Sequence, residues 1–88
     1  MRKQVVFYGR VQGVGFRYSV EMIAGHHDVT GYVRNQFDGS VEVVVEGEPN
    51  MITAFLDEIR SVRGRNISSV LESVEPATGE YHDFHVAF

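Results

Sequence analysis

The order of apolar and polar residues divides the chain into segments of two kinds. Five segments with dense or alternating apolar residues predict strands, at 3–10, 30–35, 40–46, 67–74 and 81–88. Two other segments repeat their apolar residues every three or four positions, which is typical of helices. They predict one helix over 16–27 and a second that begins at Pro49 and ends before Gly64.

Each predicted helix has an apolar stripe that should face a core. In the first helix the stripe consists of Phe16, Val20, Ile23, Ala24 and His27. In the second it consists of Ile52, Phe55, Leu56, Ile59 and Val62. Asp28 is expected to end the first helix in the left-handed conformation, which Asp tolerates better than most residues. Asp38-Gly39 is expected to form the hairpin turn before residues 40–46.

The order of elements predicts an α+β fold. Strand, helix, strand, strand, helix and strand, followed by a short C-terminal strand, is the ferredoxin-like or split-βαβ pattern. It predicts an antiparallel sheet with both helices on one face, formed by a single domain over residues 1–88. In the strand over 40–46, Val41 and Glu42 should point to opposite faces, and Glu46 should begin a solvated turn. The fold alone implies no function.

Composition argues against several classes of function. The hydrophobic fraction of 43% is typical of a globular protein, and the lack of cysteine excludes thiol chemistry. A net charge of −4 argues against a nucleic-acid partner. Without a long apolar run, a signal-peptide core or a coiled-coil seam, the chain is expected to be a cytoplasmic monomer that does not associate with membranes.

The segment between the first strand and the first helix is the strongest candidate for chemistry. Gly9, Gly13 and Gly15 interrupt it, and Arg17 follows in the first helical turn. Glycines let backbone N–H groups converge, a helix N-terminus has unpaired donors, and arginine adds a forked cation, so this segment is suited to binding phosphate. It is neither a Walker A loop nor a dinucleotide motif. A tight turn with a surface arginine is an equally good interpretation of the same residues.

Asn35 is the second candidate. It ends the run Gly31-Tyr32-Val33-Arg34-Asn35, directly before the predicted turn. An asparagine side chain can orient a water molecule without accepting its proton, but asparagine also commonly caps turns. From the residues alone, the turn-capping interpretation is favoured.

The four histidines do not predict a metal site. His26 and His27 are adjacent in the predicted helix, so their side chains should diverge by about 100°. His82 and His85 should face opposite sides of a strand. Neither a metal ion nor another cofactor is expected.

Taken together, the two candidate segments resemble the signatures of the acylphosphatase family. The run Gly-Arg-Val-Gln-Gly-Val-Gly-Phe-Arg at 9–17 is similar to a glycine-framed Val-Gln-Gly-Val-x-Phe-Arg, and the run at 31–35 resembles Gly-x-Val-x-Asn. The order and spacing of the two runs also agree, and the resemblance covers essentially the whole chain. Asp28-Val29 stands where many relatives have Gly-Leu, which alters a helix end and no reacting group.

The resemblance implies a ferredoxin-like enzyme that hydrolyses acyl phosphates to a carboxylate and inorganic phosphate. It makes Arg17 and Asn35 the catalytic residues, with Arg17 binding the phosphate and Asn35 positioning the attacking water. The implied substrate-binding residues are Gly13, Val14, Gly15, Phe16 and Arg17. Inorganic phosphate is then expected as product and inhibitor. The chemistry needs neither a general acid nor a metal ion, because the carboxylic acid of the leaving group has a pKa of roughly 4.

Two other functions stay open from the sequence. Acylphosphatase-like domains also occur within larger carbamoyl-transfer proteins, so the chain could be a module that handles phosphate or carbamoyl phosphate. A non-catalytic ferredoxin-like binding domain is the other alternative, although the net charge of −4 and the lack of an aromatic-rich RNA-binding motif disfavour an RNA-binding version.

Overall fold

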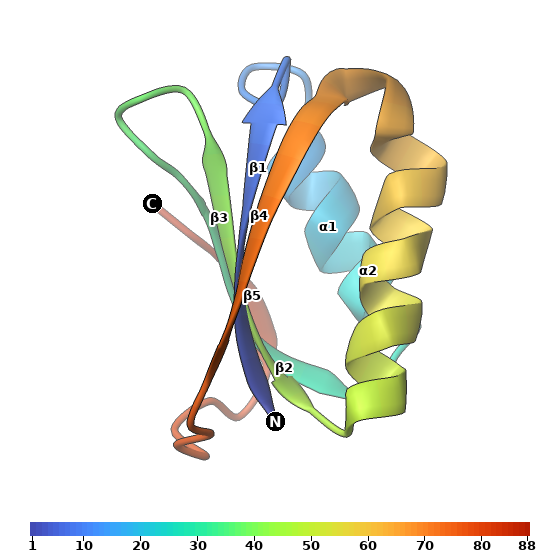
Figure 1. Cartoon of the computed structure of the whole chain (residues 1–88), viewed down its shortest axis with the longest axis vertical. Coiled ribbons are helices and arrows are strands. Elements are labelled where there is room, and N and C mark those ends of the chain that lie inside the picture. Colours follow the sequence, from blue (N-terminus) through green and yellow to red (C-terminus); the bar gives the residue numbers. More distant parts are fainter.

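In the computed structural model, which describes residues 1–88, two helices pack side by side on one face of a five-stranded sheet (Figure 1). The elements in chain order are β1 (Arg2–Gly9), α1 (Phe16–Ala24), β2 (Val29–Asn35), β3 (Val41–Gly47), α2 (Pro49–Arg63), a 3₁₀ turn (Gly64–Asn66), β4 (Ile67–Glu75) and β5 (Phe84–Ala87). The predicted α+β class and order of elements are confirmed. The last strand is shorter than predicted, because it begins at Phe84 and not at Tyr81.

The sheet is mixed, so the prediction of a purely antiparallel sheet is wrong. Its strand order is β4-β1-β3-β2-β5, and every neighbouring pair is antiparallel except β2 and β5, which are parallel. The reason is the path of residues 76–83. This segment leaves the end of β4 and passes to the opposite edge at the same end of the sheet, so β5 must run in the direction of β2 (Figure 1).

The core lies between the sheet and the two helices. The stripes predicted for the helices supply much of it, and strand valines with Phe7 supply the rest. Its helical members are Phe16, Val20, Ile23, Ala24, Ile52, Phe55, Leu56 and Ile59. Val62 was predicted to belong to this core, but its exposed fraction is 55%, because the core cluster ends at Ile59 in α2.

Helix α1 ends earlier than the apolar pattern predicts. Its last residue is Ala24, and Gly25 caps it in a right-handed conformation with φ −65°. Since no residue other than glycine has a positive φ, the left-handed stop predicted at Asp28 is wrong. His26 and His27 therefore lie in a turn, where helical spacing does not apply, and both rings lie 2.8 Å from carboxylate oxygens of Glu58 instead of diverging.

Candidate active site

The segment between β1 and α1 exposes backbone N–H groups at the start of the helix. Gly13 and Gly15 adopt the left-handed conformation, with φ values of 73° and 78°, which favours glycine at both positions. No side chain caps α1, and its first backbone hydrogen bond runs from Ser19 N–H to the Gly15 carbonyl at 3.1 Å. The N–H groups of the first turn therefore have no carbonyl partner within the helix, and they can donate to an anion.

Contacts of Phe16 and of Arg63 hold this segment in place. Phe16 is 1% exposed, and its ring centroid lies 5.4 Å from that of Phe7 in the core. From the end of α2, Arg63 donates to the Ser19 hydroxyl at 2.7 Å and to the Gly15 carbonyl at 3.3 Å. Sequence reasoning missed Arg63, because nothing in the pattern of α2 shows which arginine reaches α1.

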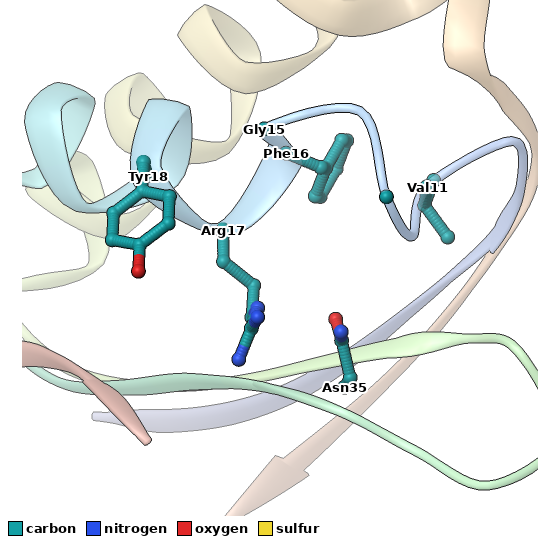
Figure 2. Close-up of a pocket in the computed structure, with 7 residues that line it drawn as sticks. Val11, Gly15, Phe16, Arg17, Tyr18 and Asn35 are labelled. Carbon is teal, nitrogen blue, oxygen red and sulfur yellow. The ribbon is translucent and has the colours of Figure 1, made fainter. Parts of the chain in front are cut away.

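A cavity of about 170 Å³ lies between this segment and the end of β2 (Figure 2). Its lining residues are Val11, Gly13, Gly15, Phe16, Arg17, Tyr18 and Asn35. The structure therefore brings together every predicted site residue except Val14, whose side chain packs against the core instead. Sequence reasoning missed Val11 and Tyr18. Tyr18 could have been found from its place beside Arg17 in the first helical turn.

Arg17 points from α1 into the space above the sheet (Figure 2). It takes part in none of the ion pairs with carboxylates, which involve Arg2, Lys3, Arg34 and Arg60. Its guanidinium interacts with two C-terminal residues: Nη1 lies 3.5 Å from the Ala87 carbonyl, and the guanidinium carbon lies 4.8 Å from the centre of the Phe88 ring. The positive charge therefore has no carboxylate partner within the chain.

Asn35 points toward the same space from the end of β2 (Figure 2). Its Oδ1 atom is buried and has no hydrogen-bond partner. Leaving such an acceptor unpaired costs about 1–3 kcal/mol, which a donor from a ligand or a water molecule would recover. The turn after β2 is capped by another residue, because Asp38 Oδ1 accepts a hydrogen bond from Ser40 N–H at 3.0 Å. Asp38, and not Asn35, thus makes the turn-capping contact.

The electrostatics around this turn agree with that assignment. Hydrogen bonds from the Ser40 side chain and backbone lower the pKa of Asp38 below its ordinary value. Asp38 is therefore ionised at neutral pH and remains an acceptor in the turn. The Asn35 side chain is left to line the cavity that Arg17 also lines.

The comparisons with known proteins identify the family. The acylphosphatase family model matches residues 3–86. The acylphosphatase of Bacillus licheniformis is 40% identical over 84 residues, which cover 96% of this chain and 91% of that protein. The chain belongs to the acylphosphatase family.

Solved structures of acylphosphatases share the whole fold. The crystal structure of acylphosphatase from Bacillus subtilis superposes with a TM-score of 0.87 at 28% identity, and covers 99% of this chain and 98% of that one. HypF of T. kodakarensis contains a similar unit, with a TM-score of 0.86 and 32% identity over all of this chain and 12% of that one. Acylphosphatase folds thus occur both as small proteins and within a larger one. In the present chain, no helix has the length and apolar character needed to cross a membrane.

Proposed function

We propose that this acylphosphatase binds and hydrolyses its substrate in the cavity between Arg17 and Asn35. The family gives the reaction, which is hydrolysis of the carboxyl-phosphate bond of an acyl phosphate. One observation supports this location above the others: a guanidinium without a carboxylate partner and a buried amide oxygen without a donor line the same cavity. The first suits an anion, and the second suits a water molecule.

The phosphate group would bind against the start of α1. Its oxygens would accept hydrogen bonds from the N–H groups of Gly13, Val14, Gly15 and Phe16 and from the two-pronged guanidinium of Arg17. Val14 fits this role through its backbone alone, since its side chain packs against the core. The cavity volume of about 170 Å³ matches a small group, so the acyl part of the substrate would extend toward solvent.

Asn35 would position the water that attacks phosphorus. If a water O–H donates to Asn35 Oδ1, a lone pair of the water oxygen can face the phosphorus atom. A bond from that oxygen to phosphorus forms as the bond from phosphorus to the carboxylate oxygen breaks, and the water proton passes to the phosphate product or to solvent. The leaving carboxylate needs no proton, because its conjugate acid has a pKa of roughly 4. Positioning and charge stabilisation are then the main requirements.

The same chemistry predicts that no divalent metal ion is required. Arg17 supplies the positive charge that a metal ion supplies in many phosphoryl-transfer enzymes. Hydrolysis of benzoyl phosphate should therefore keep its rate in the presence of EDTA, and inorganic phosphate should inhibit competitively. A loss of activity on chelation that one divalent ion restores would contradict this mechanism.

We also propose that the enzyme acts as a cytoplasmic monomer, on the strength of its lack of cysteine and of a coiled-coil pattern. We propose that residues 1–88 form a single acylphosphatase-like domain. Gel filtration across a range of protein concentrations tests the oligomeric state. A mass that rises with concentration to that of a dimer would contradict it.

The experiment that tests the proposed site is the substitution Asn35→Ala. Loss of one positioned hydrogen-bonding group should lower kcat for benzoyl phosphate by about 10²–10³-fold. KM and the inhibition constant of phosphate should change little, because Arg17 and the loop are untouched. A thermal melt shows that the variant is folded at the assay temperature. Wild-type kcat in the folded variant, or loss of phosphate inhibition instead, would contradict the role of Asn35.

A further inference from the structure

We infer that Gln12 is a positioning residue that holds Asn35 at a fixed distance from the phosphate-binding loop. Its side-chain Nε2 lies 2.7 Å from the Gln36 carbonyl and 2.8 Å from the Ser40 carbonyl, and donates to both. A carboxamide nitrogen has two hydrogens, so both are used. The inference rests on the proposed function, since it assigns Gln12 a role through Asn35.

The two acceptors belong to the turn that directly follows Asn35. Gln36 is its neighbour in the chain, and Ser40 lies across the turn. The turn closes without help from Gln12, because Gly39 N–H donates to the Gln36 carbonyl at 3.1 Å and Gln36 N–H donates to the Ser40 carbonyl at 2.9 Å. The bonds from Gln12 are therefore not needed to form the turn. They fix where the turn lies relative to the loop that contains Gln12.

The position of the loop over 10–15 relative to the β2–β3 turn depends on Gln12. Val11 is buried, but Gly13 and Gly15 have positive φ and exposed backbone, and glycine restricts the chain least. The backbone N–H of Arg10 donates to the Asn66 carbonyl at 2.8 Å, and the Gly15 carbonyl accepts from Arg63 at 3.3 Å. Only the side chain of Gln12 links the loop to the β2–β3 turn by hydrogen bonds. The loop and the β2–β3 turn lie at the same end of the sheet in Figure 1. One half-buried amide thus joins the two walls of the cavity.

The consequence for the reaction is a separation of binding from turnover. The phosphate would be held by α1 and the loop, and the water by Asn35 on the opposite wall. If the walls shift relative to each other, phosphate can still bind, but the water no longer lies in line with the bond that breaks. A misplacement of about 1 Å can cost roughly 10²-fold in rate. Gln12 should therefore affect kcat more than KM.

A double-mutant cycle with Gln12→Met and Asn35→Ala tests this inference. Methionine is close to glutamine in size and shape but donates no hydrogen bond. Gln12→Met should lower kcat for benzoyl phosphate by about 10- to 100-fold, with KM and the phosphate inhibition constant within about twofold of wild type. When Asn35 is already alanine, the same substitution should lower kcat by less than about twofold, because the group it positions is gone.

The outcomes distinguish a failure of the proposed function from a failure of the role proposed for Gln12. If Asn35→Ala keeps wild-type kcat, the proposed function fails. If Asn35→Ala is impaired and Gln12→Met has no effect, or has the same effect in both backgrounds, only the role of Gln12 is overturned. A large rise in the phosphate inhibition constant of Gln12→Met would also overturn it, since Gln12 would then support the loop itself. Arg2→Met, far from the cavity, is the control for loss of stability without loss of positioning.

Discussion

Arg17 and Arg2 carry the same guanidinium group in two different settings. Arg2, at the start of β1, donates to Glu75 at 2.9 Å, to Glu80 at 3.0 Å and to Glu46 at 3.2 Å. Arg17 has no carboxylate partner and lines the cavity. The difference indicates that Arg2 is used within the fold, where it ties residues 76–83 to the sheet. The proposed function assigns Arg17 to the binding of an external anion.

On the face of the sheet opposite the helices, a buried carboxylate has hydrogen-bond donors for its oxygens. Glu42 is buried and accepts hydrogen bonds from Gln4 at 2.6 Å, Arg34 at 2.8 Å and Tyr32 at 3.0 Å. Burial and the nearby Glu42 carboxylate raise the pKa of Tyr32 to about 12, so its hydroxyl remains a donor at neutral pH. Three side chains therefore donate to the carboxylate of Glu42. The cavity, in contrast, contains an acceptor with no donor at all.

The largest effect is expected from Arg17→Lys. Lysine keeps the positive charge but loses the planar fork that contacts two phosphate oxygens, so kcat/KM for benzoyl phosphate should fall by about 10³-fold. The measurement is steady-state kinetics, with circular dichroism to show that the variant is folded. Arg2→Lys is the matched control and should keep kcat/KM within about twofold. If both variants retain activity, the comparison between the two arginines fails.

A smaller and different effect is expected from Arg2→Met. The variant removes the cation shared by three carboxylates, and hydrogen bonds to charged groups contribute roughly 1.5–3 kcal/mol. The free energy of unfolding should fall by about 2 kcal/mol, which lowers the Tm of a domain of this size by roughly 10 °C. Urea unfolding and kinetics at 25 °C check both parts. A wild-type Tm, or a fall in kcat comparable to that of Arg17→Lys, would contradict the structural role of Arg2.

A third effect concerns the pH dependence of stability. The N–H groups of Thr78 and Gly79, with Arg2, lower the pKa of Glu46 to about 2. Because the pKa in the folded chain lies below the ordinary value near 4.5, ionised Glu46 stabilises the fold above that pH. This stabilisation should be lost as the pH falls from about 4.5 toward 2, by at most about 1.4 kcal/mol for each pH unit.

Glu46→Gln isolates this contribution. The variant should be less stable than wild type at pH 7, and its stability should depend less steeply on pH between 4.5 and 2. Urea unfolding at a series of pH values measures both slopes. Identical slopes for variant and wild type would show that Glu46 titrates normally in the folded chain.

The elements that form the fold could be predicted because each depends on local pattern. The apolar stripes of both helices and the alternation of Val41, Val43 and Val45 in β3 required only the periods of helix and strand. Glu46 shows the limit of this reasoning. It was expected in a solvated turn, but it is 7% exposed, because residues Thr78 and Gly79, more than thirty positions later, fold back and bond to it. Nothing near Glu46 in the sequence indicates that contact.

In the candidate site, too, local motifs could be predicted, whereas contacts between distant segments could not. Arg17 and Asn35 could be named from two short motifs, and the structure places both on one cavity. The bonds from Gln12 to the carbonyls of Gln36 and Ser40 could not be predicted, because any residue type presents a backbone carbonyl. Such contacts depend on where two distant loops meet. The contribution of Arg63 at the start of α1 was missed for the same reason.

The most direct test of the proposed phosphate site is a titration of the ¹⁵N-labelled protein with inorganic phosphate, followed by NMR of the backbone amides and arginine Nε groups. Phosphate binding at the proposed site should give saturable shifts of the amides of residues 13–17 and of Arg17 Nε. Asn35→Ala should preserve these shifts at nearly the same affinity, whereas Arg17→Lys should require far more phosphate. Shifts that leave residues 13–17 unchanged and centre on another arginine, such as Arg34 or Arg65, would contradict it.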